Sequence, residues 1–215
     1  MLSDLTTSAF MLIGYLVGSI PTGYLIARAM GVDIQKVGSG NIGATNVLRA
    51  LGPGPALAVA LLDPLKGYLV TVFPLVLGLD PTTVALTGFA TVLGNNFNIF
   101  LRLRGGKGIA TSLGVFFAVE PLVSLMICIL GLTTMTLGRL VSLGSLVGVL
   151  AAPLMLLARG RFELPYFLLA VAIMVLSGYK HRENIRRLMA GTERRLGERV
   201  APQEQVAARA SKESP

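Results

Sequence analysis

Three segments of the chain combine glycines, small polar residues and cations in patterns that suit phosphate binding. The first, GSGNIGATNVLRALGPG, runs from Gly38 to Gly54. Its glycines let backbone N–H groups point into a common hollow that favours anions. Arg49 adds a forked cation that matches phosphate oxygens. Further donors are the side chains of Ser39, Asn41, Thr45 and Asn46. The alternative for this segment is a flexible linker of glycine and small polar residues.

The second segment, RGGKG, places Gly105, Gly106 and Lys107 directly before a long apolar run. Amide groups at a helix start and the helix dipole both favour an anion there, so the segment predicts an anion site beside a membrane face. The P-loop spacing G-x-x-x-x-G-K-[ST] is absent. For the nearby Arg102 the alternative is an anchor to anionic lipid headgroups.

The third segment, KHRENIRRLMAGTERRLG, follows the last apolar run. His181 and Asn184 are three residues apart and Arg187 follows after three more, so these side chains share one helical face. Arg194 and Arg195 suit contact with acidic lipid. We therefore expect the side chains of His181, Asn184 and Arg187 to point together toward the other polar loops.

Two further pairs have helical spacing inside or beside apolar runs. Ser142 and Ser145 are three residues apart, and the alternative to a site role for them is bonding to the preceding turn of their own helix. Asp63 and Lys66 are also three apart, and a mutual ion pair is the economical explanation for charges inside a membrane. Cys128, the single cysteine, lies in an apolar run and is interpreted as packing.

The elements that must position these residues are membrane helices. Of 215 residues, 53% are hydrophobic and 14% are charged, with a mean hydropathy of +0.71, and such a composition favours an all-α integral membrane protein. Since about 20 apolar residues cross the hydrocarbon core, the sequence predicts about seven transmembrane helices near residues 8–29, 55–78, 82–101, 108–119, 121–137, 139–158 and 164–180. The segment Ile109 to Leu137 could also form one long bent helix.

Charge predicts the orientation of this bundle. With the N-terminus outside and the C-terminus cytoplasmic, sixteen of the 19 Lys and Arg residues fall on the inner side. Only Arg159 and Arg161 fall outside, whereas Asp80, Glu120 and Glu163 all lie at outer ends. The positive-inside rule therefore explains most of the net charge of +8 without a nucleic-acid partner. We assign residues 1–198 to one membrane domain and predict a polar, disordered cytoplasmic tail at 199–215.

Five motifs in order then carry a family resemblance: GSIPTGYLIAR, GSGNIGATNVLRALG, FLRLRGGKGIATSLG, RLVSLGSL and HRENIRRLMAGTE. From about residue 10 to residue 195 the chain resembles the bacterial acyl-phosphate:glycerol-3-phosphate acyltransferases, the PlsY family. The resemblance implies a seven-span bundle in the cell inner membrane with an active site on the cytoplasmic side. It also implies acyl transfer from acyl phosphate to the 1-hydroxyl of sn-glycerol 3-phosphate. Lysophosphatidic acid and phosphate would form for phospholipid synthesis, with no metal, cofactor or acyl carrier protein.

The resemblance also implies roles for individual residues. Ser39 and Arg49 would contact the phosphorylated substrates, and Asn184 would hold the acceptor. The phosphate site would be lined by Gly105, Gly106 and Lys107, and the same pocket would be shaped by His181, Ser142 and Ser145. The catalytic residues expected on this basis are Ser39, Asn95, His181 and Asn184, with membrane lipid surrounding the domain.

The chain departs from the family pattern at two positions. The family usually has a histidine and a proline, as in G-H-x-F-P, where this chain has Asn95 and Asn98. Asparagine can hold a hydrogen bond but cannot act as a general base. Three alternatives follow: the acceptor phosphate takes the hydroxyl proton while Asn95 orients the substrate, His181 supplies the base, or the protein is a weakened or repurposed copy.

Two other classes of protein compete with this interpretation. A transporter or lipid-binding membrane protein could use the same anion site, but a transporter needs access from both faces and the polar segments lie on one side. An acyltransferase with another donor, such as acyl-CoA, is chemically close. Its usual H-x-x-x-x-D motif is absent, because Arg186 stands five residues after His181.

Overall fold

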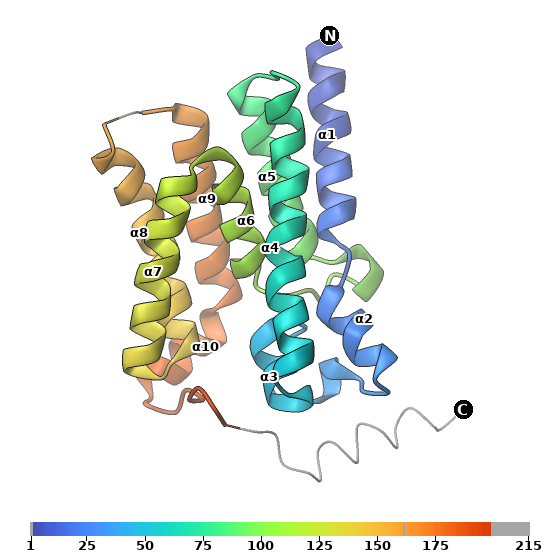
Figure 1. Cartoon of the computed structure of the whole chain (residues 1–215), viewed down its shortest axis with the longest axis vertical. Helices are drawn as coiled ribbons and strands as arrows, with labels where there is room; N and C mark the ends of the chain where they lie inside the picture. The colour runs from blue at the N-terminus through green and yellow to red at the C-terminus, as the bar shows by residue number, and fades with distance from the viewer. Residues whose placement is uncertain (1, 161, 199–215) are drawn as a thin grey trace.

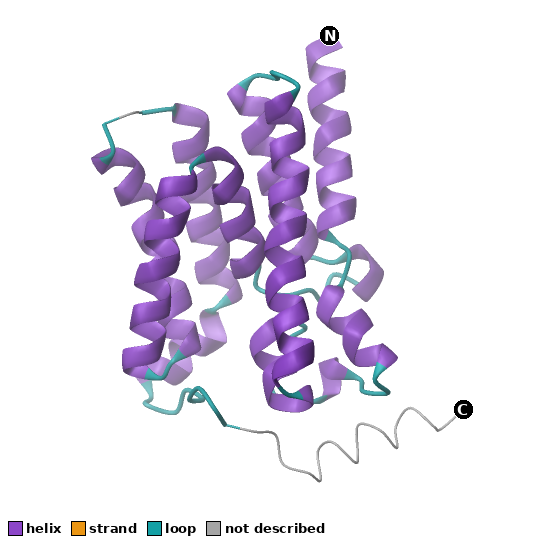
Figure 2. Cartoon of the chain, viewed as in Figure 1, coloured by secondary structure: helices purple, strands orange, loops and turns teal. Residues whose placement is uncertain are grey.

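The computed structural model describes residues 2–160 and 162–198, and every regular element in these ranges is helical (Figures 1 and 2). The prediction of an all-α fold is therefore confirmed. Residue 161 and the predicted tail at 199–215 lie outside the described residues, so the division into domain and tail stays a prediction. In chain order the elements are α1 (Leu2–Gly18), α2 (Thr22–Ala29), η1 (Ile34–Lys36), α3 (Ala44–Leu51), α4 (Pro53–Val76), α5 (Pro81–Asn96), η2 (Ile99–Leu101), α6 (Ile109–Val119), α7 (Pro121–Gly138), α8 (Val141–Ala158), α9 (Leu164–Lys180) and α10 (Arg182–Met189).

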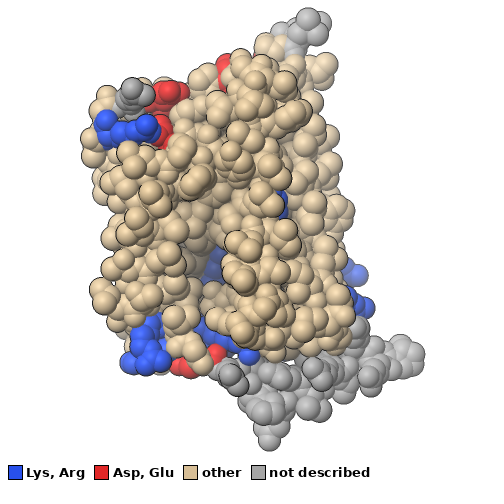
Figure 3. Space-filling view, in the orientation of Figure 1, with Lys and Arg blue, Asp and Glu red and all other residues tan. Residues whose placement is uncertain are grey.

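The long helices stand side by side and expose apolar side chains around their middle. Figure 3 shows the charged side chains of this face gathered mainly toward its two ends, with an uncharged band between them. The N-terminal end of α1 and the short helices α3 and α10 lie at opposite ends of the bundle (Figure 1). An uncharged band between charged ends is the surface expected of a helix bundle that sits in a bilayer.

The number of membrane crossings is only partly supported. Among the described residues, five helical segments are long and apolar enough to cross a membrane, or six if the bent pair α9 and α10 forms one span. The remaining predicted span, at 108–119, coincides with α6, which has 11 residues. At 1.5 Å per residue such a helix covers about 16 Å, roughly half of a hydrocarbon core. The seven-span count therefore stays a prediction.

Prolines stand at two helix boundaries, one of which the sequence prediction missed and one of which it left open. The predicted helix at 8–29 is broken between α1 and α2, where Pro21 precedes the first residue of α2. The alternative of one bent helix from Ile109 to Leu137 is wrong, because α6 ends at Val119 and α7 begins at Pro121. Proline suits the first position of a helix, where its missing N–H has no partner to lose. Figure 1 shows α6 and α7 folding back on each other at this joint.

Glycines bring α1 and α5 into close contact. A Cβ added at Gly18 would lie 2.1 Å from the Thr91 carbonyl oxygen, and one added at Gly94 would lie 2.1 Å from the Tyr15 carbonyl oxygen. Neither position can therefore hold a side chain without moving the partner backbone. Because of this contact, the segment between α1 and α2 lies against the end of α5.

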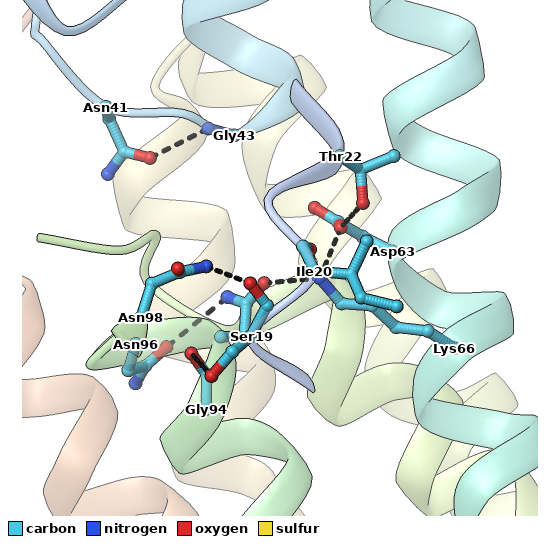
Figure 4. Close-up of polar contacts among 11 residues, drawn as sticks. Ser19, Ile20, Thr22, Asn41, Gly43, Asp63, Lys66, Gly94, Asn96 and Asn98 are labelled. Carbon is cyan, nitrogen blue, oxygen red and sulfur yellow. Dashed lines mark hydrogen bonds and ion pairs between the residues drawn. The ribbon is translucent and has the colours of Figure 1, made fainter. Parts of the chain in front are cut away.

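The end of α5 is held by tertiary hydrogen bonds. The last carbonyl groups of a helix have no partner within the helix, and here each finds a donor from elsewhere in the chain. Figure 4 shows part of this arrangement, in which Asn98 also donates to the Ser19 carbonyl. The bonds run from Ser19 Oγ to Gly94 O (3.2 Å), from Gly106 N to Asn95 O (2.9 Å), from Lys180 Nζ to Asn96 O (2.7 Å) and from Tyr15 Oη to Phe97 O (2.7 Å). The polar loops of the predicted site are thereby fixed to the ends of α1 and α9.

Candidate active site

The loop before α3, the loop before α6, the start of α8 and the joint between α9 and α10 enclose one cavity of about 400 Å³. It gathers residues that are up to 155 positions apart in the chain, such as Ser39 and Arg194. Its lining includes all but one of the predicted site residues, namely Ser39, Asn41, Thr45, Asn46, Arg49, Asn95, Gly106, Lys107, Ser142, Ser145, His181 and Asn184.

Gly105 is the predicted site residue that does not line the cavity. A Cβ at this position would lie 2.1 Å from the carbonyl oxygen of Asn95. Gly105 therefore lets the loop before α6 lie directly against the end of α5, where Gly106 N donates to Asn95 O. The structure shows a packing role for Gly105, and its predicted contact with phosphate remains untested.

A chain of polar contacts crosses the cavity from Lys107 to Glu193. Lys107 Nζ donates to Asn184 Oδ1, and Asn184 Nδ2 donates to Glu193 Oε1 at 2.7 Å. Ser142 Oγ donates to the same oxygen at 3.0 Å, and Arg187 Nε donates to Glu193 Oε2 at 2.7 Å. Glu193 therefore fixes the amide of Asn184 with its oxygen toward Lys107. The helical-face prediction for Asn184 and Arg187 is confirmed in that both reach one partner.

Glu193 was missed as a site residue. Its local signal was a lone carboxylate in the basic stretch from Arg186 to Arg195. Its side chain is only 6% exposed. Desolvation by itself would raise the pKa of Glu193, but hydrogen bonds from Asn184, Arg187 and Ser142 outweigh it and hold the pKa below its ordinary value. Glu193 is thus an anion at neutral pH.

Lys107 is a cation of the cavity that remains partly free. Burial lowers its pKa to about 8, while the nearby Glu193 carboxylate acts in the opposite direction. At pH 7 the ammonium group is therefore mostly charged. Among the described residues, its hydrogen-bond acceptor is Asn184. An ammonium has three N–H donors, so Lys107 retains capacity for an anionic ligand in the cavity.

His181 is buried and neutral. Burial lowers its pKa to about 4, and the Lys107 charge acts in the same direction. Its Nδ1 lies 2.9 Å from the Ser177 carbonyl oxygen, which can only accept a hydrogen bond. The proton of the neutral ring must therefore sit on Nδ1, and Nε2 keeps its lone pair. His181 can accept a hydrogen bond from a substrate hydroxyl.

The loop before α3 is ordered by two asparagines and is not a flexible linker. Asn46 Nδ2 donates to the carbonyls of Ile34 (3.3 Å) and Val37 (2.9 Å), and Asn46 Oδ1 accepts from Ser39 N at 3.0 Å. Asn41 Oδ1 accepts from Gly43 N at 2.9 Å. These side chains hold the loop that presents Ser39 to the cavity and that leads into α3, which carries Arg49. The predicted substrate contacts of Asn41 and Asn46 stay predictions.

Ser142 and Ser145 differ in their partners. Ser142 reaches Glu193, as described above, whereas Ser145 Oγ donates to Val141 O at 2.9 Å, one turn earlier in α8. The helix-bonding alternative is therefore correct for the Ser145 hydroxyl, although the residue still lines the cavity. Ser142 is therefore part of the polar network around Glu193, whereas the hydroxyl of Ser145 bonds within α8.

The predicted ion pair between Asp63 and Lys66 is confirmed, with 2.8 Å between Nζ and Oδ1. Thr22 Oγ1 donates to the same Asp63 oxygen at 2.9 Å. Lys66 Nζ also donates to the Ile20 carbonyl (3.1 Å) and to Asn95 Oδ1 (2.8 Å). Figure 4 shows Thr22, Asp63 and Lys66 meeting beside Ile20, in the break after α1. The side-chain oxygen of Asn95 is thus engaged by Lys66.

Asn98, the second departure from the family pattern, also has bonds of its own. Its Nδ2 donates to the Ser19 carbonyl, and its Oδ1 accepts from Phe100 N at 3.1 Å at the start of η2. At the two positions that differ from the family pattern, Asn95 therefore holds the charge of Lys66 and Asn98 holds the local backbone.

The cavity continues as an apolar groove between α6, α7 and α8. Gly131, Gly144 and Gly148 bring α7 and α8 together: a Cβ at Gly144 would lie 2.3 Å from the Gly131 carbonyl oxygen. The apolar part of the lining includes Ile109, Leu113, Phe116, Ile127, Leu132, Met135, Val141 and Val149, with Cys128 among them as a free thiol. Across residues 2–160 and 162–198 no cluster of three His, Cys, Asp or Glu side chains offers a metal site. The arrangement suits a ligand with an anionic head and a hydrocarbon chain.

Comparison with known proteins gives a consistent result. A family model described as glycerol-3-phosphate acyltransferase matches residues 8–191. The chain is 49% identical over 199 residues to a Deinococcus radiodurans protein named glycerol-3-phosphate acyltransferase 1, covering 92% of this chain and 99% of that protein. A glycerol-3-phosphate acyltransferase of Thermus thermophilus is 49% identical over 193 residues, covering 88% of this chain and 95% of that protein.

Solved structures agree with the sequence matches. The crystal structure of PlsY (YgiH), an integral membrane glycerol 3-phosphate acyltransferase, in its glycerol 3-phosphate form superimposes with a TM-score of 0.85 at 42% identity. That match covers 89% of this chain and 96% of the other. The lysophosphatidic acid form of the same protein gives a TM-score of 0.83 at 41% identity. The similarity thus extends to nearly the whole of both chains.

Proposed function

This chain belongs to the glycerol-3-phosphate acyltransferase family, and on that premise we propose that it transfers an acyl group from acyl phosphate to the 1-hydroxyl of sn-glycerol 3-phosphate. The products are lysophosphatidic acid and inorganic phosphate, in phospholipid synthesis. The observation that carries the proposal is the continuity of one cavity from a cationic end, with Arg49 and Lys107, to the apolar groove between α6, α7 and α8.

The groove favours acyl phosphate as the donor. An acyl phosphate has an anionic head and a long apolar chain joined by one carbonyl group, and the cavity offers cations and an apolar wall in that order. Arg49 and Lys107 suit the phosphate, while Leu113 and Phe116 line the apolar part. The acceptor, glycerol 3-phosphate, has one phosphate and two hydroxyls. The amide of Asn184 and the lone pair of His181 Nε2 are hydrogen-bond partners for its polar groups.

The chemistry proposed for the site is direct displacement. The 1-hydroxyl oxygen attacks the acyl carbon, a tetrahedral intermediate forms, and the bond from the acyl carbon to the phosphate oxygen breaks. The hydroxyl proton passes to the departing phosphate and not, as the sequence alone suggested, to the phosphate of the acceptor, so no separate base is needed. Asn95 has no proton-accepting role, since its side-chain oxygen accepts from Lys66. The cations stabilise the charge that gathers on the phosphate.

In this proposal the chain crosses the cell inner membrane seven times, with the N-terminus outside and the cavity on the cytoplasmic side. The support is the distribution of Lys and Arg along the sequence, since sixteen of the 19 fall in segments on the predicted inner side. Membrane lipid then has direct access to the groove, and water-soluble glycerol 3-phosphate reaches the cavity from the cytoplasm.

The proposal is tested with purified protein in lipid, palmitoyl phosphate and glycerol 3-phosphate, by measuring phosphate release and lysophosphatidic acid. Arg49→Ala should lower turnover by at least about 10²-fold, because one charge-assisted contact to phosphate is lost. Arg102→Ala is the matched control, since Arg102 is exposed and does not line the cavity, and it should retain activity. No product above background in the wild type, with Asn95→His also silent, would overturn the proposal.

A further inference from the structure

The first turns of α6 contain two buried hydroxyl groups without a partner. Thr111 and Ser112 are 1% and 2% exposed, and both line the cavity. Neither hydroxyl has a hydrogen-bond partner among the described residues. Buried polar side chains in folded proteins nearly always have one, so these two groups need an explanation that the protein alone does not supply.

Other helical hydroxyls in the chain show what is missing. Thr87 Oγ1 donates to Thr83 O at 2.7 Å, and Thr91 Oγ1 donates to Thr87 O at 2.9 Å, each one turn earlier in α5. This local bond is the usual solution for a threonine or serine inside an apolar helix. The hydroxyls of Thr111 and Ser112 do not make it. Both residues are almost fully buried but line the cavity, so a molecule bound there is the candidate for the missing partner.

Their place in the chain and in the cavity identifies the atom that they would meet. Lys107, which holds charge at the polar end, precedes them by one turn, and Leu113 and Phe116 in the apolar lining follow them. A ligand that extends from Lys107 to Phe116 has its junction between head and chain beside Thr111 and Ser112. In an acyl phosphate that junction is the carbonyl group.

The N-terminus of α6 adds to the same effect. The helix begins after Gly108, which has a left-handed backbone with φ of 77° and offers no capping side chain. The free amides and the helix dipole therefore favour negative charge beside the first turn. During acyl transfer the carbonyl oxygen becomes such a charge as the tetrahedral intermediate forms.

We propose that the hydroxyl groups of Thr111 and Ser112 donate hydrogen bonds to the acyl carbonyl oxygen and stabilise it as an oxyanion. This inference rests on the proposed function and extends it to the reacting carbonyl. The hydroxyls keep their protons throughout: the 1-hydroxyl oxygen bonds to the acyl carbon, the carbonyl re-forms, and phosphate leaves with the acceptor's proton. Their contribution is greatest when the oxygen is negative.

The test is the double variant Thr111→Val with Ser112→Ala, assayed with palmitoyl phosphate and glycerol 3-phosphate beside the wild type. The maximum turnover should fall by about 10²-fold, the loss known for one oxyanion donor, while the KM for glycerol 3-phosphate changes by less than about threefold. The thermal unfolding midpoint should not fall, because the removed hydroxyls bond nothing in the protein. Thr111→Ser should restore the turnover lost in Thr111→Val.

Thr71→Val is the matched control. Thr71 is fully buried in α4, its hydroxyl is also without a partner among the described residues, and it does not line the cavity. Thr71→Val should leave turnover unchanged, and its thermal unfolding midpoint should be equal to that of the wild type or slightly higher. Wild-type turnover in the double variant would overturn the oxyanion role alone, and so would a loss of activity accompanied by a lower unfolding midpoint than that of Thr71→Val. An inactive wild type would overturn both the proposed function and this inference.

Discussion

Two partly buried lysines of this protein, Lys66 and Lys107, differ in how many hydrogen-bond acceptors surround their ammonium groups. Lys66 Nζ has three acceptors, namely the Ile20 carbonyl, the Asp63 carboxylate and the Asn95 side-chain oxygen. Lys107 Nζ has one acceptor among the described residues, the amide oxygen of Asn184. Since an ammonium carries three N–H donors, Lys66 is satisfied by the protein and Lys107 is not.

The difference separates a structural charge from a binding charge. Lys66 joins the break after α1 to α4 and to the end of α5, and the backbone of Asn95 in turn accepts from Gly106 N. The satisfied lysine therefore helps to position the loop that carries the unsatisfied one. Removing Lys66 should act first on the fold, and removing Lys107 should act first on the reaction.

The largest effect is expected for Lys66→Met. It leaves the Asp63 carboxylate buried without its cation, a change that costs about 3–5 kcal/mol in other proteins. The thermal unfolding midpoint in detergent should fall sharply, as followed by the loss of helical circular dichroism. Adding Asp63→Leu to Lys66→Met should recover much of the loss. If Lys66→Met unfolds at the wild-type temperature, the description of Lys66 as a structural charge is wrong.

Lys107→Met should show the reverse pattern. Loss of its positive charge should lower kcat/KM by about 10²–10³-fold, because a cation beside the phosphate is removed. Stability should be unchanged or higher, since burial already disfavours the charged form of Lys107. Turnover and thermal unfolding measured on the same preparation check both parts. A lower unfolding midpoint with retained turnover would show that Lys107, like Lys66, serves mainly the fold.

This contrast also shows how far the sequence could lead. Asp63 and Lys66 are three residues apart, so helical spacing alone predicted their ion pair. Asn95 is 29 residues from Lys66 in the chain, and no local spacing links them. The same limit hid Glu193, whose partners Ser142, Asn184 and Arg187 come from two regions of the chain. Contacts within one turn were predictable, whereas contacts between elements required the fold.

The fold was predictable for a similar reason. Apolar runs located the helices, because a membrane helix must be apolar along its length. The short α6 was located as well, since the predicted span at 108–119 matches Ile109–Val119, but the sequence could not show where the loop before α6 attaches to α5. Gly105 illustrates this: its sequence suggests a phosphate loop, but its missing side chain makes room for the Asn95 carbonyl.

A pH titration offers a smaller effect that concerns Lys107 alone. Its pKa is lowered to about 8, so the free enzyme loses the cation as pH rises through this value. We expect kcat/KM for glycerol 3-phosphate to fall above pH 8, by up to about tenfold per pH unit. Lys107→Arg should move this alkaline limb to higher pH, because arginine stays charged. An unchanged limb in Lys107→Arg would assign it to another group.

The smallest effect is expected for Asn95→His, at the position where the resembled family has histidine. A neutral imidazole nitrogen can accept the hydrogen bond from Lys66 as the amide oxygen does. Turnover should therefore change by less than about threefold. Asn95→Leu provides the contrast: it leaves Lys66 one acceptor short and should destabilise the protein by about 1–3 kcal/mol. If Asn95→His instead raises turnover by orders of magnitude, the histidine acts as a base, and direct proton transfer to the departing phosphate is not the main route. A small change would mean that the residue at position 95 acts as a hydrogen-bond acceptor for Lys66, and that asparagine and histidine can both do this.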